Sequence, residues 1–106
     1  MSNVYSSQLL FVSDGGSVEE VTVPGDVVWV VRDIVTTVKT GSDGDSLDLL
    51  NTGAVLYIHT FVASDVQSLI QHWVGHQVVK PGQTLTFEPQ AGTWDVLVSG
   101  YSLSLP

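Results

Sequence analysis

Apolar and polar residues alternate with a period of two over several short segments of the chain. Residues 29–38, 54–62, 84–88 and 94–99 each show this alternation. A period of two is typical of β-strands, because successive side chains point to opposite faces of a sheet. The chain has 19 Val, 9 Thr and 3 Ile against 3 Ala, and this excess of β-branched residues favours strands over helices. We therefore predict an all-β fold.

The predicted strands differ in how many apolar faces they have. Segment 29–38 is predicted to carry its even-numbered residues on one face and its odd-numbered residues on the other, and both faces are mostly apolar. Such a strand is expected to be central and covered on both sides. Residues 54–62 show the same pattern. In segment 84–88, Leu85 and Phe87 alternate with polar residues, which predicts one buried face and one wet face.

The last predicted strand contains a break. Trp94, Val96 and Val98 alternate with Asp95, Leu97 and Ser99 before Gly100 interrupts the pattern. A glycine inside a strand marks a bulge or kink. The alternation then continues through Tyr101, Leu103 and Leu105.

Turn-forming residues divide the chain at short intervals. Pro, Gly, Asn and Asp gather at residues 14–16, 24–26, 41–44, 51–53, 81–83 and 91–92. Residues 4–12 and 18–23 predict two further strands, and residues 64–71 predict one helical turn, capped by Ser64, before a strand over residues 70–79. A chain of 106 residues forms one domain. We predict that residues 1–106 fold as a single antiparallel β-sandwich or jelly roll of about seven to nine strands.

The chain is acidic and poor in charge. Charged residues make up 13%, and 3 Lys and Arg stand against 11 Asp and Glu for a net charge of -8. Phosphate binding needs several cations, so this balance argues against a nucleic-acid partner. The absence of cysteine excludes a disulfide framework, a thiol nucleophile and a thiolate metal site.

No apolar segment approaches the length of a membrane span. No uninterrupted apolar stretch is longer than that of residues 27–31, whereas a span needs about 18 residues. The N-terminus lacks a basic region, and residues 9–12 are too few for the core of a signal peptide. We expect no membrane insertion, and we expect the chain to be made and folded in a cytoplasm.

Two motifs raise the question of a metal ion. The acidic loop at residues 43–48 does not follow the EF-hand pattern, so a solvated turn is expected there. His72 and His76 have a spacing that would let both bind one ion on a helix. Gly75 and the Val-rich residues that follow favour a strand instead, where these histidines would lie about 13 Å apart. His59 is a candidate third ligand, but nothing in the sequence places it near these two histidines. We predict no metal and no cofactor, and we place the histidines at a surface or an interface.

Catalytic motifs are absent from the sequence. The chain has 12 Ser but no Gly-x-Ser-x-Gly elbow and no glycine-rich phosphate loop. A pair of carboxylates would have to converge in space, and a domain of this size has little room for a deep cleft. We predict that the protein is not an enzyme and has no catalytic residues.

The three tryptophans raise a carbohydrate-binding alternative, because flat aromatic faces stack on sugar rings. Trp29 and Trp94 lie in strongly alternating segments and are expected in the core. Trp73, beside Gly75, is the candidate for exposure, against the alternative that it packs in the core or at a subunit contact.

The low charge also bears on assembly. Free surfaces usually carry about 25–35% charged residues, and interfaces are depleted in charge. With 13% charged residues and a mean hydropathy of +0.28, part of the surface is expected to be covered by other subunits.

Three segments resemble small β-sandwich virion proteins of tailed bacteriophages, of the kind called minor tail proteins. They are residues 23–34 (VPGDVVWVVRDI), 71–85 (QHWVGHQVVKPGQTL) and 94–101 (WDVLVSGY). In such proteins a Pro-Gly turn leads into a Val-Val-Arg-Asp-Ile strand, and a second one precedes the penultimate strand. A tryptophan-containing strand then ends in Ser-Gly-Tyr.

The resemblance implies a jelly-roll-like subunit without catalytic residues, assembled as a homo-oligomer, most often a trimer, on a phage tail tip. The implied partners are copies of itself and other virion proteins, with a host-surface glycan as a further candidate. His72, Trp73 and His76 are the candidate interface or exposed site. Arg32 and Asp33 are adjacent on a strand, so each is expected to pair with another residue, with Arg32 in a structural role.

Other assignments remain open at this point. A capsid decoration protein and a carbohydrate-binding or receptor-binding module would share the β-rich composition. A small enzyme of cupin type would need a carboxylate and two or three histidines to converge inside the barrel, and the histidines of this chain are His59, His72 and His76.

Overall fold

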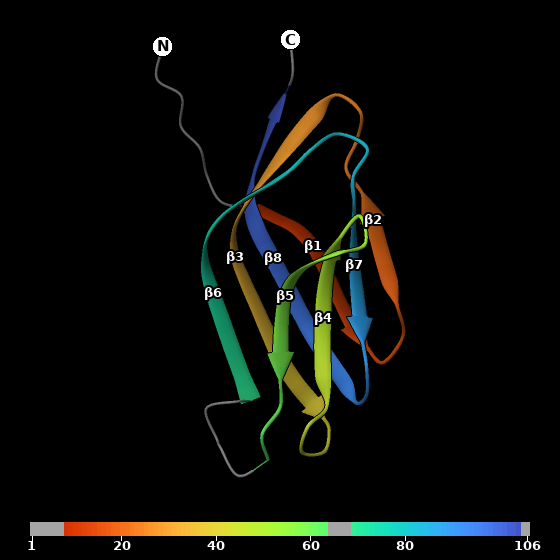
Figure 1. Cartoon of the computed structure of the whole chain (residues 1–106). Helices are drawn as coiled ribbons and strands as arrows, with labels where there is room; N and C mark the ends of the chain where they lie inside the picture. Colours follow the sequence, from red (N-terminus) through yellow and green to blue (C-terminus); the bar gives the residue numbers. More distant parts are fainter. Residues whose placement is uncertain (1–7, 64–68, 105–106) are drawn as a thin grey trace.

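The computed structural model describes residues 8–63 and 69–104, which form eight β-strands and no α-helix (Figure 1). The strands are β1 (Gln8–Gly15), β2 (Glu19–Thr22), β3 (Val27–Thr40), β4 (Ser46–Asn51), β5 (Ala54–Thr60), β6 (Ile70–Val79), β7 (Thr84–Pro89) and β8 (Thr93–Ser104). The all-β prediction and the strand number are thus confirmed. Among the described residues, no helix is long and apolar enough to cross a membrane.

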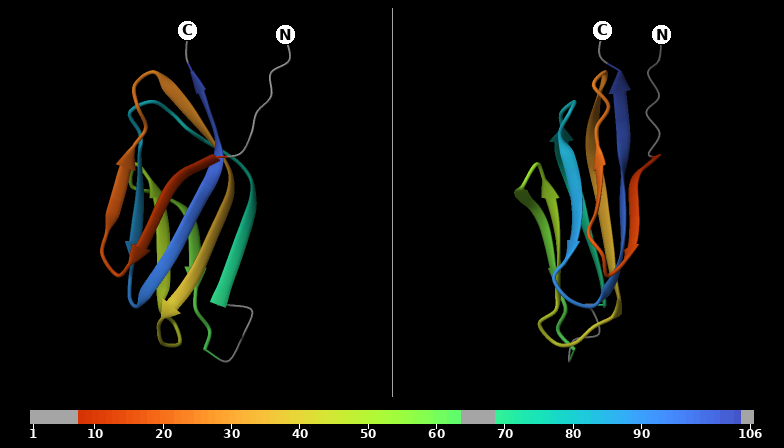
Figure 2. Two further views of the ribbon diagram at one scale, coloured as in Figure 1. Left: turned by 180° about the vertical axis from the view of Figure 1, so that it is seen from behind. Right: turned by 90° about the vertical axis from the view of Figure 1, so that its right-hand side faces the viewer.

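The strands form two four-stranded antiparallel sheets that pack face to face, as the side view in Figure 2 shows. Sheet A has the order β1-β8-β3-β6, and sheet B has the order β2-β7-β4-β5. Only β4 and β5 are consecutive strands within one sheet, and the other connections pass between the sheets. Eight strands connected in this way form a jelly roll, which confirms the predicted fold class.

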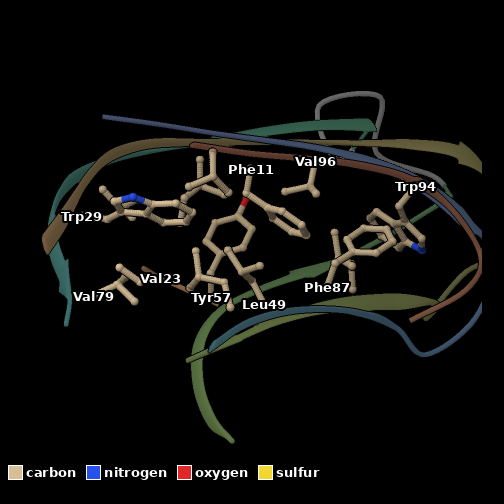
Figure 3. Close-up of a cluster of buried hydrophobic side chains, with 14 of the residues drawn as sticks. Phe11, Val23, Trp29, Leu49, Tyr57, Val79, Phe87, Trp94 and Val96 are labelled. Atoms are coloured by element: carbon tan, nitrogen blue, oxygen red, sulfur yellow. The ribbon is translucent and has the colours of Figure 1, made fainter. Parts of the chain in front are cut away.

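The core lies between the two sheets, where both Trp29 and Trp94 are buried as predicted. Figure 3 shows the two indole rings toward opposite ends of the cluster, with Phe11, Tyr57 and Leu49 between them. Strand alternation supplies the remaining inward side chains. Fully buried members of the cluster include Val31, Ile34, Leu47, Leu49, Val79, Leu85, Phe87, Val96 and Val98.

An irregularity at Arg32 corrects the predicted faces of β3. The strand register shifts between Val31 and Asp33 against both β6 and β8. Because one residue is accommodated outside the ladder, the alternation changes phase at this point. Trp29 and Val31 therefore share the interior with Ile34 and the residues that alternate with it, although strict alternation assigned them to the opposite face.

Gly100 on β8 lies opposite this irregularity, where a break was predicted. Its register partner is Val31, and a Cβ atom at position 100 would overlap the carbonyl oxygen of Val30. The close approach of the two backbones requires a residue without a side chain.

The prediction that residues 54–62 form a central strand is wrong. β5 ends at Thr60 and is an edge strand of sheet B, paired with β4 alone. Its outer side chains Val55 and Ile58 are 57% and 49% exposed. Apolar residues on both faces did not distinguish this edge strand from β3, which is central as predicted.

Other strand boundaries agree closely with the sequence analysis. The strand predicted over residues 70–79 is β6, and the six predicted turns fall at strand ends or between strands. The predicted helical turn, the start of the strand predicted from residue 4, and Leu105 lie wholly or partly outside the described residues.

Candidate interaction surface

The outer face of sheet A is the most apolar exposed surface of the described part of the chain. Six aliphatic side chains on this face are 41–62% exposed, namely Leu9, Val12, Ile70, Val74, Val78 and Leu97. A continuous row crosses all four strands, in which Val12, Leu97, Val35 and His72 are successive register partners. This face has no layer of the described chain packed over it.

The outer face of sheet B is more polar. The comparable row consists of Glu88, Asp48 and Ile58 on β7, β4 and β5. The buried residues of β7 alternate with Thr84, Thr86 and Glu88. Val55 and Ile58 on β5 are the large exposed aliphatic residues of this sheet among the described residues. The two outer faces of the sandwich thus differ in chemistry.

A hollow of about 310 Å³ lies on the outer face of sheet A, between β1, β8 and β3. Val12, Val35 and Leu97 contribute apolar walls, and Asp14 and Asp95 lie at its border. The Lys39 ammonium lies 3.7 Å from Asp14 Oδ2 and 3.8 Å from Asp95 Oδ1. These partly exposed ion pairs contribute little stability, but they place a cation between two carboxylates at one end of the apolar face.

β6 forms the lateral border of sheet A, with β3 on one side and no strand of the described residues on the other (Figures 1 and 2). Exposed and covered residues alternate along it without a break from Ile70 to Val78. The strand contains no Asp, Glu, Lys, Arg or Pro. Natural edge strands are commonly protected by charges or proline against pairing with other chains, and β6 lacks both.

The three predicted site residues all lie on β6, but Trp73 faces the opposite side of the sheet from His72 and His76. His72 and His76 are exposed, whereas Trp73 is partly buried and packs against the core. The ring of Trp73 covers Gly75, since a Cβ atom there would lie 2.6 Å from Trp73 Cζ2. The structure therefore separates the histidines from the tryptophan.

Arg32 and Asp33 pair with β6 rather than with each other, as predicted. Arg32 Nε donates a hydrogen bond to the Gly75 carbonyl oxygen at 3.0 Å, across the irregularity in β3. Asp33 Oδ1 lies 2.8 Å from His72 Nε2. Both side chains hold the border strand β6 to its single neighbour in the sheet.

The interior contains a polar cluster that the sequence analysis did not identify. Thr36 Oγ1 lies 2.9 Å from Tyr57 Oη and 2.7 Å from His59 Nδ1, and all three residues are buried. The His59 ring also packs edge-on against Trp94, with a centroid separation of 4.9 Å. Tyr57 and His59 were predicted to lie on the same face of one strand. Their partner Thr36 lies in the other sheet, so no pattern in the sequence around Tyr57 and His59 indicates this contact.

The three histidines do not converge. His59 is fully buried between the sheets, whereas His72 and His76 are exposed on the outer face of sheet A. Within the described ranges, no group of three or more His, Cys, Asp or Glu side chains is placed to hold a metal ion. The arrangement that a cupin-type enzyme needs is therefore not formed by these histidines.

Two carboxylates of the acidic loop accept hydrogen bonds from backbone amides. Asp45 Oδ2 accepts one from the Ser42 amide at 2.7 Å, and Asp43 Oδ1 accepts one from the Ala63 amide at 3.0 Å. The Asp45 contact lies within the turn that the sequence predicts, and the Asp43 contact joins the turn to the segment after β5.

Among the described residues, the large hydrophobic side chains that are exposed are all aliphatic. Trp73 is partly buried and packs against the core, which counts against a carbohydrate site at this position.

No protein-family model matches this chain, and no curated protein sequence is significantly similar to it.

Proposed function

We propose that this protein is a non-enzymatic structural subunit that assembles with copies of itself, as a minor tail protein at the tail tip of a bacteriophage. The observation that carries the self-assembly is the apolar outer face of sheet A with its six exposed aliphatic side chains. The location in a tail rests on the three segments that resemble minor tail proteins.

The size of this face supports an interaction role. Complete burial of one large aliphatic side chain removes roughly 60–120 Å² of apolar surface from water. Six side chains that are about half exposed therefore offer on the order of 300 Å². An apolar area of this size is comparable with the largest apolar patch on a typical soluble monomer, and such a patch is often a functional site.

The low charge of the chain supports the same conclusion. A free domain of this size would be expected to carry about twice the observed 13% of charged residues. The net charge of -8 makes copies repel at long range, so short-range apolar contacts have to supply the attraction. Self-association should then strengthen as salt screens the repulsion.

Solution mass by light scattering, over a concentration series at low and high salt, tests the self-assembly. We expect a mass above that of the 11.4 kDa chain, rising with salt. The variant Leu97→Glu on sheet A should lower the mass, and the matched control Ile58→Glu on sheet B should not. A monomer at all concentrations, or an equal effect of the two substitutions, would overturn the proposal.

The position in a virion needs a separate test. Particles purified from cells that produce the chain would be labelled with gold-conjugated antibodies against it. Label at the tail tip supports a minor tail protein, whereas label on the head, as for a capsid decoration protein, or no label on particles would overturn the tail assignment.

A further inference from the structure

We propose that β6 pairs antiparallel with β6 of a second copy, about a two-fold axis that passes through Val74. This inference rests on the proposed self-assembly and specifies one contact of it. The pairing would join two copies of sheet A into one continuous eight-stranded sheet.

The proposed pairing is based on the sequence of the border strand β6, which is nearly palindromic. Residues 70–78 read IQHWVGHQV. In an antiparallel pair centred on Val74, Ile70 faces Val78 of the second copy, and the other pairs in this register are Gln71 with Gln77, His72 with His76, and Trp73 with Gly75. Residues of the same type face each other in this register, except where the largest side chain faces the smallest.

The Trp73–Gly75 pairing is sterically favourable. Trp73 already covers Gly75 of its own strand, where a Cβ atom would lie 2.6 Å from the ring. In the two-fold pair Gly75 of the second copy lies directly opposite Trp73, so the two indole rings do not face each other across the axis. A register shifted by two residues along one strand would lose this match and would place histidine against Ile or Val.

The exposure pattern of β6 fits this pairing. The exposed positions are Ile70, His72, Val74, His76 and Val78, and the covered positions between them face the core. A two-fold axis perpendicular to the sheet keeps the exposed side chains of both strands on one side. The three aliphatic residues, 52–62% exposed in one copy, become cross-strand neighbours of aliphatic residues in the other.

Backbone hydrogen bonding gives the contact its strength. Nine antiparallel residue pairs exchange about eight to ten N–H···O bonds, which matches the roughly ten hydrogen bonds of a typical protein interface. The strand carries no ionised carboxylate or ammonium group of its own, so the pairing brings few of the excess negative charges close together.

The other strand edges of the described chain fit less well. β2 has four residues and carries Glu19 and Glu20, and β1 carries Asp14. β5 is also uncharged, and the register of both β5 and β6 shifts against the neighbouring strand. The exposure of β5 does not alternate regularly, whereas that of β6 alternates without a break.

Disulfide trapping tests the register, and the absence of native cysteine makes the disulfide of any single-cysteine variant intermolecular. In Val74→Cys the two thiols face each other at the axis, with Cα atoms about 4.5–5.5 Å apart, within the range for a disulfide. The matched control is Ile70→Cys, because Ile70 is exposed to a similar extent as Val74. In this register, however, position 70 of one copy lies about 26 Å from position 70 of the other. The double variant Ile70→Cys/Val78→Cys should cross-link again.

The expected result is a dimer with twice the mass of the 11.4 kDa chain, covalently trapped under mild oxidation in Val74→Cys. Because pairing raises the local thiol concentration to the millimolar range, the cross-linked fraction at micromolar protein should be ~10-fold or more above that of Ile70→Cys. Val74→Lys should abolish the dimer, since an edge lysine opposes strand pairing. Unfolding curves of each variant would verify that these exposed substitutions leave the fold intact.

Two results would overturn this inference while the proposed self-assembly stands. One is an oligomer in which Val74→Cys cross-links no better than Ile70→Cys. The other is an oligomer whose mass Val74→Lys leaves unchanged, for instance a trimer formed through the face of sheet A. A wild-type monomer at all concentrations would overturn both.

Discussion

Thr36 Oγ1 lies 2.7 Å from His59 Nδ1, and this hydrogen bond joins the two sheets inside the sandwich. Thr36 belongs to the central strand β3 of sheet A, and His59 belongs to the edge strand β5 of sheet B. The same threonine oxygen lies 2.9 Å from Tyr57 Oη. Because buried polar groups are costly when unpaired, the three side chains favour one relative position of the two sheets.

Replacing Thr36 by valine should destabilise the fold. Thr36→Val keeps the shape of the side chain but removes the oxygen that Tyr57 and His59 share. We expect the free energy of unfolding to fall by about 1–3 kcal/mol, measured by urea denaturation. Thr37→Val, on the outer face of the same strand, should change it by less than about 0.5 kcal/mol. Equal losses in the two variants would show that the buried oxygen has no special role.

Gly100 should not tolerate a side chain. A Cβ atom there would overlap the carbonyl of Val30, and backbone on a central strand cannot move aside. We expect Gly100→Ala to lower the free energy of unfolding by about 3 kcal/mol or more. Gly25→Ala is the control, because no atom lies within 4 Å of the added methyl group, and it should change stability by about 1 kcal/mol or less. A soluble Gly100→Ala protein with wild-type stability would contradict the observed backbone approach.

Tyr57 should make the fold sensitive to alkaline pH. Burial raises the pKa of the Tyr57 hydroxyl above 10.0, and hydrogen bonds to Thr36 and Gln71 only partly oppose this. Above pH 10 the unfolded chain releases the proton that the folded chain retains, so stability falls with rising pH. The stabilisation by Tyr57 is fully present below pH 10 and is lost as the pH rises through the pKa of Tyr57 in the folded state. Urea unfolding at several values between pH 9 and pH 11 should show a steeper loss for the wild type than for Tyr57→Phe, and parallel curves would refute this role.

Local sequence patterns were sufficient for most strand boundaries and buried faces. The alternation in β7 and β8 correctly identified Leu85, Phe87 and Trp94 as buried. Turn residues marked the strand ends because their backbone preferences act within a few residues. Such features depend on neighbouring residues and hardly on the partner strand.

Two features of the fold depended on distant residues. The phase change at Arg32 arises where β3 meets Gly100 of β8 and Gly75 of β6, and neither contact leaves a mark near residue 32. The edge position of β5 follows from the order in which the strands pair. Its apolar residues on both faces resemble those of a central strand.

The candidate site likewise combines features that the sequence predicts with features that only the structure shows. The sequence singled out His72, Trp73 and His76 as an interface or exposed site, and that assignment stays a prediction. The structure places the two histidines outside and the tryptophan against the core. It also shows β6 at the border of its sheet, and the proposed pairing with a second copy uses this nearly palindromic strand.

By itself, the sequence determined that the chain is acidic and cysteine-free, and it determined a β-fold with its turns and most of its inward-facing residues. Composition and two-residue periodicity are local properties, and they persist whatever the strand order. The tertiary structure decided which strands are edges, which outer face is apolar, and which polar residues meet in the core. These properties arise from hydrogen bonds between strands far apart in the chain, which the periodicity of a single strand does not specify.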